Sequence, residues 1–266
     1  MTKPDASPES TAPPGRRARV LAVTSGKGGV GKTFVSANLA AALASRGERV
    51  LVLDADLGLA NLDVVLNLYP KTTLHDVFTG KATLDDAIVP APGGFSVLLA
   101  GSGMVEYSRL TPELRTRLVD VVRSLSPRFD RILLDTGAGI SDVVLFAVSL
   151  ADDVLLVVTP EPTSMTDAYA TAKVLSTQQQ RELIRLVVNQ TGRLGEARAI
   201  RGQLQRVVDH YVNAAAAQPL RLDLVGDIPT DPAVRDAVQK RQLLLEVYPG
   251  STAAKAVAAL AARLAP

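Results

Sequence analysis

Seven short, unbroken aliphatic runs recur along the chain between residues 19 and 225. Each has four to six residues rich in Val and Leu without alternation of apolar and polar positions, which is typical of strands buried on both faces. The runs cover residues 19–24, 49–53, 95–99, 131–134, 153–158, 183–188 and 220–225. Helical patterns separate them, so the sequence predicts an α/β fold, a doubly wound, mostly parallel sheet with helices on both faces.

One of the separating segments shows how its helix is encoded. Thr111 is a favourable N-cap, and Pro112 follows at the first helical position, where the missing backbone N–H has no intrahelical partner anyway. Apolar residues then recur with helical spacing at Leu114, Leu118, Val121, Val122 and Leu125. We expect this face to pack on the sheet.

Charge and residue content narrow the function classes. Lys and Arg total 29 against 27 Asp and Glu, a net charge of +2, so no direct nucleic-acid binding is expected. The absence of cysteine excludes disulfides and thiolate chemistry and fits a reducing cytoplasm. His75 and His210 each stand alone, so we expect neither a zinc site nor histidine-based catalysis.

The chain divides into a tail and one domain. Residues 1–18 are polar and Pro-rich without periodicity, which predicts a flexible N-terminal tail, with a docking peptide as the alternative. Residues 19–266 form the predicted domain. The longest apolar run, residues 143–151, is about half of the ~20 residues that a membrane span needs, and the N-terminus has no secretory apolar region. A cytoplasmic protein is expected, with the cell pole or the inner-membrane face as candidate positions.

A glycine-rich segment follows the first aliphatic run. Gly26, Gly31, Lys32 and Thr33 satisfy the phosphate-loop pattern G-x-x-x-x-G-K-[ST]. In such loops backbone N–H groups turn toward phosphate oxygens, the lysine brings charge to the β- and γ-phosphates, and the hydroxyl binds Mg²⁺. The segment therefore predicts binding of ATP or ADP with Mg²⁺. The expected nucleotide-binding residues here are Gly26, Lys27, Gly28, Gly29, Val30, Gly31, Lys32, Thr33 and Phe34.

Lys27 is a second lysine, which the plain pattern does not require. The segment KGGVGKT resembles the deviant Walker A loop of MinD and ParA ATPases, and the resemblance extends over residues 19–264. It implies a MinD-like P-loop ATPase domain of the SIMIBI class, in which this lysine reaches the nucleotide of a second subunit. Two triphosphates brought face to face repel unless cations lie between them, so a homodimer in ATP is expected. A solvated loop lysine is the alternative.

Three aspartates follow the second and fourth runs. Asp54 and Asp56 lie two residues apart and so point to the same side, and Asp135 ends a hydrophobic run in the Walker B arrangement. The resemblance implies that Asp56 activates water, whereas Asp54 has the alternative of capping a turn. Gly139 is expected near the γ-phosphate. The predicted catalytic residues are Asp56, Lys27 and Lys32, and the predicted Mg²⁺ ligands are Thr33, Asp56 and Asp135.

The resemblance assigns three further strand ends to the nucleotide. Glu161 follows the fifth run and would lie near the dimer interface, with a helix-entry carboxylate as the alternative. Asn189 follows the sixth run, and Pro229 and Asp231 follow the seventh. In similar ATPases these positions frame the adenine, and a side-chain amide suits the amino group and ring nitrogen of that base. Ordinary loop residues are the alternative.

Three segments narrow the resemblance. DADLGLANLD, DTGAGIS and TPEPTS look most like the flagellar-number regulators called FlhG, FleN or YlxH. That implies a dimerising switch that hydrolyses ATP to ADP and phosphate, slowly on its own, and regulates flagellar number or placement. The implied partners are the signal-recognition-type GTPase FlhF, a transcription activator and switch-ring proteins. The alternatives are a MinD-like cell-division positioning ATPase and an ATP-liganded antagonist of a flagellar transcription activator with little turnover.

Both ends of the chain depart from some of these relatives. The tail has no DQAxxLR-like segment of the kind that stimulates FlhF, which weakens the case for that activating role. Membrane-binding relatives end in a basic amphipathic helix, but residues 253–266 carry only Lys255 and Arg263. A last core helix with weak or no membrane binding is therefore expected. Its apolar face is Val257, Leu260, Ala261 and Leu264.

Overall fold

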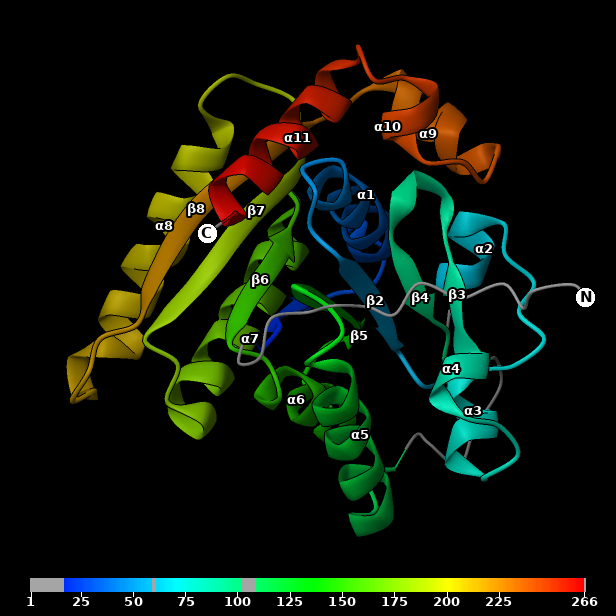
Figure 1. Cartoon of the computed structure of the whole chain (residues 1–266). Coiled ribbons are helices and arrows are strands. Elements are labelled where there is room, and N and C mark those ends of the chain that lie inside the picture. The colour runs from blue at the N-terminus through cyan, green and yellow to red at the C-terminus, as the bar shows by residue number, and fades with distance from the viewer. Residues whose placement is uncertain (1–16, 59–60, 102–108, 266) are drawn as a thin grey trace, which may run out of the picture.

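A single sheet runs through the computed structural model, which describes residues 17–58, 61–101 and 109–265 (Figure 1). Its strand order among these residues is β3-β4-β2-β5-β1-β6-β7-β8, and every neighbouring pair is parallel except β3 with β4. The strands are β1 (Arg19–Ser25), β2 (Val50–Ala55), β3 (Ile88–Pro90), β4 (Ser96–Leu98), β5 (Arg131–Ala138), β6 (Asp153–Val158), β7 (Leu183–Thr191) and β8 (Arg221–Pro229). The predicted fold class is confirmed.

Helices cover both faces of the sheet. One apolar cluster joins α1, α2, α9, α10 and α11 to one face, and a second joins α3 through α8 to the other. The helices are α1 (Lys32–Ala44), α2 (Leu62–Leu66), α3 (Leu74–Phe78), α4 (Leu84–Ala87), α5 (Pro112–Leu125), α6 (Asp142–Ser149), α7 (Pro162–Gln179), α8 (Glu196–Tyr211), α9 (Pro232–Gln239), α10 (Leu244–Val247) and α11 (Thr252–Leu264). Short 3₁₀ turns lie at Pro92–Gly94 and Asn213–Ala215.

All seven predicted strands form, and three of them extend well past their aliphatic runs. β5 continues to Ala138, β7 to Thr191 and β8 to Pro229, because polar residues beyond an apolar run still pair their backbones. The sequence analysis missed β3, which is antiparallel to β4 at the sheet edge. It has three residues and ends in Pro90, too short a segment to show any periodicity.

The cap predicted for α5 is confirmed. Thr111 Oγ1 accepts a hydrogen bond from the Leu114 amide at 3.2 Å, with Pro112 in the first turn. Of the five predicted apolar positions, Leu114, Leu118, Val121 and Leu125 are buried and Val122 is half-buried. The helical spacing thus places the apolar stripe against the sheet.

The start of the described chain is already part of the domain. Ala18 is buried and its amide donates to the Ser126 carbonyl at 2.9 Å. Beside it, the Arg17 side chain pairs with Asp152. Residues 1–16 of the predicted tail lie outside the described residues.

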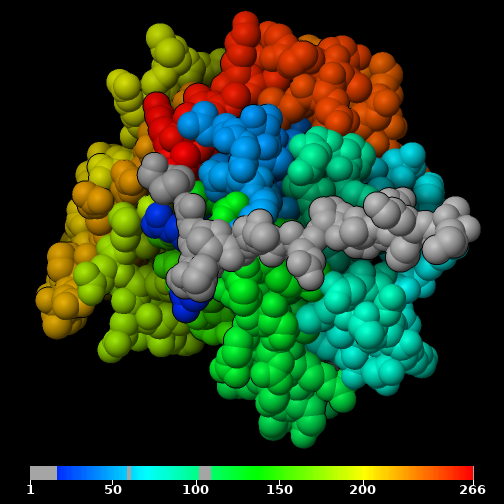
Figure 2. All heavy atoms as spheres, in the orientation of Figure 1, coloured from blue at the N-terminus to red at the C-terminus, as the bar shows by residue number. Residues whose placement is uncertain are grey.

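The C-terminal helix α11 packs on β8 and α1, which confirms the prediction of a last core helix. All four predicted face residues are at most 5% exposed. Leu260 packs over Gly226 of β8, where a Cβ would lie 3.4 Å from Leu260 Cδ1, an ordinary van der Waals contact. In the space-filling view the C-terminal helices border the end of α1 (Figure 2). Across the described residues, no helix is both long and apolar enough to span a bilayer.

Truncating Leu260 tests the packing of α11. Leu260 is 1% exposed, so Leu260→Ala leaves a cavity and should lower the free energy of unfolding by about 2–5 kcal/mol. Lys255→Ala, at an exposed position of the same helix, should change it by less than about 0.5 kcal/mol. Urea unfolding followed by circular dichroism measures both, and equal stability of the two variants would contradict the packing.

Candidate functional site

The phosphate-loop segment occupies the carboxyl end of the central strand, between β1 and α1. At two positions of this segment the surrounding atoms leave no room for a side chain, so glycine is required. A Cβ at Gly26 would lie 2.2 Å from the Asp167 carbonyl carbon in α7, and one at Gly31 would lie 2.4 Å from Asn189 Nδ2. Gly31 also has φ 90°, a left-handed conformation at the N-cap of α1. The loop therefore fits closely between α7 and β7.

A cavity of about 880 Å³ opens over this loop. It is bounded by the loop, the segment after β2 and the segment around the end of β5, as expected for a crevice at the carboxyl ends of parallel strands. Its lining includes Gly28, Gly29, Gly31, Lys32, Thr33, Phe34, Asp56, Asn61, Gly137 and Ser141. The structure thus brings most of the predicted loop residues together with Asp56.

Asp135 lies buried beneath this cavity, at 3% exposure. Its Oδ1 accepts a hydrogen bond from Ser36 Oγ at 2.8 Å, and the Thr33 side chain bonds to the same carboxylate. Burial raises the pKa of Asp135 to about 6, although these hydrogen bonds and the charge of Lys32 oppose the rise. Burial also lowers the pKa of Lys32, against the charges of Asp135 and Asp56. The predicted Mg²⁺ ligands and the phosphate-loop lysine therefore form one electrostatic cluster.

Asp54 differs from Asp56 in its surroundings. It is 1% exposed, and its Oδ1 accepts the Asp56 amide at 3.1 Å, so the turn-capping alternative is confirmed. Burial, with the charges of Asp135 and Asp56, raises the pKa of Asp54 well above its usual value. Asp56, by contrast, lines the cavity.

Lys27 is held within its own chain. Its Nζ donates to Glu161 Oε2 at 3.0 Å and to Thr163 Oγ1 at 2.9 Å. Both charged side chains remain partly exposed, at 38% for Lys27 and 61% for Glu161. Glu161 is the N-cap of α7 and makes no side-chain cap hydrogen bond, so it is a helix-entry carboxylate whose side chain contacts Lys27.

The predicted adenine residues lie outside the lining of this cavity. Asn189 is within β7, and its Nδ2 donates to the Val30 carbonyl at 2.8 Å, which braces the phosphate loop. Gln190 beside it has φ 61° at a break in the strand register. Asp231, two residues beyond Pro229, caps α9 by accepting the Ala233 amide, and its other oxygen accepts from Thr252 Oγ1. These bonds, with the Ala253 amide, lower the pKa of Asp231.

Sequence reasoning missed two of the side chains that hold this site. Ser36 lies one turn after Thr33 on the same face of α1, a spacing that could have identified it. No sequence pattern links Thr163 to Lys27, the residue whose side chain it contacts. Gly139, which was predicted, has φ 88° and donates its amide to the Ser25 carbonyl at 2.8 Å, so its loop contacts the end of β1. In the part of the chain described, no group of three or more His, Cys, Asp or Glu side chains gathers as a metal site.

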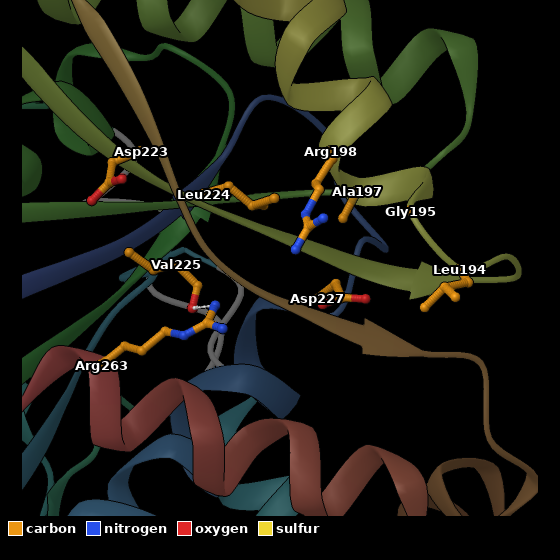
Figure 3. A pocket seen from close by; sticks show the side chains of 9 residues that line it. All are labelled: Leu194, Gly195, Ala197, Arg198, Asp223, Leu224, Val225, Asp227 and Arg263. Atoms are coloured by element: carbon orange, nitrogen blue, oxygen red, sulfur yellow. Dashed lines mark hydrogen bonds between the residues drawn. The ribbon is translucent and has the colours of Figure 1, made fainter.

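A second hollow, of about 660 Å³, lies along the open edge of β8. Arg198 of α8 and Arg263 of α11 point toward the strand from opposite sides (Figure 3). Arg263 Nη1 donates a hydrogen bond to the Val225 carbonyl at 3.0 Å. The Leu222 carbonyl accepts a hydrogen bond from Arg201 Nε, and the Leu222 amide donates one to Gln205 Oε1. None of the predicted site residues lines this hollow.

Comparison with known proteins agrees with this geometry. A family model described as an AAA domain matches residues 18–187. The antiactivator FleN of Pseudomonas aeruginosa is 44% identical over 92% of this chain and 86% of its own. The flagellum site-determining protein YlxH of Helicobacter pylori is 32% identical over 92% and 81%. The septum site-determining protein MinD of Pyrococcus horikoshii, solved with Mg-ADP, superposes with a TM-score of 0.76 at 29% identity, covering 93% and 96%.

The buried Asp135 makes stability depend on pH. Between its unfolded pKa of 3.8 and its folded pKa of about 6, the folded chain holds a proton that the unfolded chain has lost. The free energy of unfolding therefore falls as pH rises through this window. Asp135→Asn cannot ionise, so it should exceed the wild type by up to about 3 kcal/mol at pH 7 and converge with it near pH 4.

Urea unfolding of the nucleotide-free chain in a chelator, at a series of pH values, measures this difference. Asp120→Asn, at an exposed position of α5, is the matched control and should follow the wild type throughout. A constant gap between Asp135→Asn and wild type from pH 4 to pH 7 would contradict the raised pKa.

Proposed function

The chain belongs to the AAA-domain family of MinD/ParA-type ATPases, and from this premise we propose that it is an ATP-dependent dimerising switch that regulates flagellar number and placement. The observation that carries the proposal is the convergence of Lys32, Thr33 and Asp56 on one cavity, next to a lysine held at the surface by a carboxylate. Similarity to FleN and YlxH, whose names refer to antiactivation and flagellum siting, supports the flagellar role.

The phosphate loop and its surroundings fit a nucleotide with Mg²⁺. The close contacts at Gly26 and Gly31 keep side chains out of the loop, so backbone N–H groups can face phosphate oxygens together with Lys32. Thr33, Asp56 and Asp135 offer hydroxyl and carboxylate oxygens, the ligands that Mg²⁺ prefers. When bound there, the ion would supply positive charge to the β- and γ-phosphates.

Asp56 is the residue that we assign to the attacking water. It lines the cavity and is accessible there, whereas Asp54 is buried against backbone amides. In the proposed reaction Asp56 holds the water, the water oxygen bonds to the γ-phosphorus, and the bond to the β–γ bridging oxygen breaks. ADP leaves with that electron pair, and the proton of the water passes to phosphate. Without an arginine finger turnover should be slow, since such a residue is worth ~10³–10⁵ in rate.

Lys27 is assigned to the dimer. Its ammonium group is held by Glu161 and Thr163 of the same chain, at a partly exposed position from which another acceptor can reach it. A phosphate of a second, ATP-loaded subunit would compete for the ammonium group as a stronger anionic partner. Closing of the dimer would then exchange one carboxylate contact for a phosphate contact. After hydrolysis the charge that held Lys27 across the interface would be lost, and the pair would separate.

The partners proposed for the dimer are flagellar regulators, namely a signal-recognition-type GTPase, a transcription activator and switch-ring proteins. The name of the relative FleN, an antiactivator, favours one alternative in particular. In that alternative ATP is a structural ligand with little turnover and the chain sequesters an activator. Bound ATP would stabilise the binding state by ~2.7 kcal/mol at a hundredfold excess over its dissociation constant.

Removing Asp56 separates the two possibilities. Asp56→Ala should still bind ATP but should release phosphate at least ~100-fold more slowly, because the water loses its orienting carboxylate. The variant should therefore accumulate as an ATP-bound dimer in sedimentation experiments. Lys32→Ala, which removes the main phosphate contact, should bind neither ATP nor a second copy. Phosphate release by Asp56→Ala at the wild-type rate would refute the hydrolytic assignment.

Removing Lys27 tests the dimer contact. Lys27→Ala should bind ATP within ~10-fold of wild type, because Lys32 remains, yet stay monomeric in ATP when hydrolysis is blocked by Asp56→Ala. Lys81→Ala in the same background makes the same charge change at an exposed loop position and should dimerise normally. Sedimentation velocity across a range of protein concentrations distinguishes the two. A dimer of equal strength in both variants would be incompatible with the role of Lys27.

A further inference from the structure

A third cavity, of about 240 Å³, lies beside the phosphate-loop cavity but shares no lining residue with it. Its walls come from the end of β2, the start of α2, the segment after α2 and the end of β4. The polar side chains among them are Asp54, Asp63, Tyr69 and Thr73. No Lys, Arg or His is among the described residues that line it.

Two carboxylate oxygens in these walls lack a partner. Asp54 is 1% exposed, and the Asp56 and Leu62 amides contact its carboxylate, yet its Oδ2 is buried without a hydrogen bond of good geometry in the described structure. Asp63 Oδ1 is likewise buried and unpaired among these residues. Buried carboxylate oxygens are normally hydrogen-bonded or bound to a cation, because desolvation without compensation is costly. Two such oxygens on one small cavity make it a candidate cation site.

We propose that this cavity binds a hydrated divalent cation of the Mg²⁺ class, separate from the ion expected at the phosphate loop. The side-chain donors are all oxygens, which suit a hard cation, and Mg²⁺ is commonly held by one or two carboxylates while keeping several waters. The Thr73 hydroxyl is engaged in the capping box of α3, where it donates to Asp76 Oδ2 at 3.0 Å, so the two carboxylates are the main side-chain ligands on offer. The volume leaves room for an ion with part of its hydration shell.

The two carboxylates lie at either end of the segment that contains Asp56, so an ion bound to both would affect that segment. Asp54 is the second-last residue of β2, and Asp63 lies in the first turn of α2. They bracket the segment that contains Asp56, which lines the phosphate-loop cavity. An ion bound to both would fix the two ends of that segment at one spacing. The site itself does not depend on the proposed hydrolysis or dimerisation.

Terbium luminescence of the full chain tests the site. Tb³⁺ binds the oxygen sites of hard divalent cations and emits when a nearby tyrosine is excited, and Tyr69 lines this cavity. We expect saturable emission that Mg²⁺ reverses by competition. Asp63→Asn should weaken Tb³⁺ binding at least ~10-fold, because even residues that merely orient metal ligands are worth that much. Asp63→Glu, which keeps the charge, should retain tighter binding than Asp63→Asn.

Two controls keep the result specific. Asp120→Asn removes an exposed carboxylate of α5 and should leave the Tb³⁺ midpoint unchanged. Binding of a fluorescent ADP to Asp63→Asn should stay at the wild-type level, which shows that the variant is folded and that its phosphate loop is intact. Equal Tb³⁺ midpoints for wild type and Asp63→Asn, or no saturable emission from wild type, would overturn the proposal while leaving the assigned ATPase function untouched.

Discussion

The close fit of the phosphate loop between α7 and β7 is the constraint on which the rest of the site depends. A side chain at Gly26 would collide with the backbone of α7, and one at Gly31 would collide with the side-chain amide of Asn189. Because neither contact leaves room for a Cβ, the path of the loop is fixed by elements distant in sequence. That path sets Lys27 beside Glu161 at the start of α7 and starts α1 so that Lys32 and Ser36 meet Asp135.

A second feature of the site is that it buries two carboxyl groups. Asp54 and Asp135 are neighbours across β2 and β5, both almost fully buried, and the pKa of each is raised. Nearby, one lysine and a set of hydroxyl and amide donors offset this charge only in part. A buried cluster of this kind favours the binding of cations.

The sequence predicted those features of the fold and site that are encoded by residues close together in the chain. The seven aliphatic runs and the phosphate-loop pattern depend on adjacent residues; the runs are confirmed as strands, and the loop lies between β1 and α1. Contacts between segments far apart in the chain could not be predicted from the sequence in the same way. Asp231 was assigned to adenine by resemblance, yet its side chain joins the starts of α9 and α11, which no spacing within one segment reveals. The same holds for the Lys27 contact with Thr163 and for the cavity shared by Asp54 and Asp63.

The two margins of the sheet carry a consequence for the molecule in a crowded cell. At one margin β3 is three residues long and ends in proline, and at the other the outward backbone groups around Leu222 and Val225 of β8 are taken up by side chains from α8 and α11. Both features limit the backbone groups that either margin can offer to another strand, which disfavours edge-to-edge growth into ribbons or amyloid-like fibres.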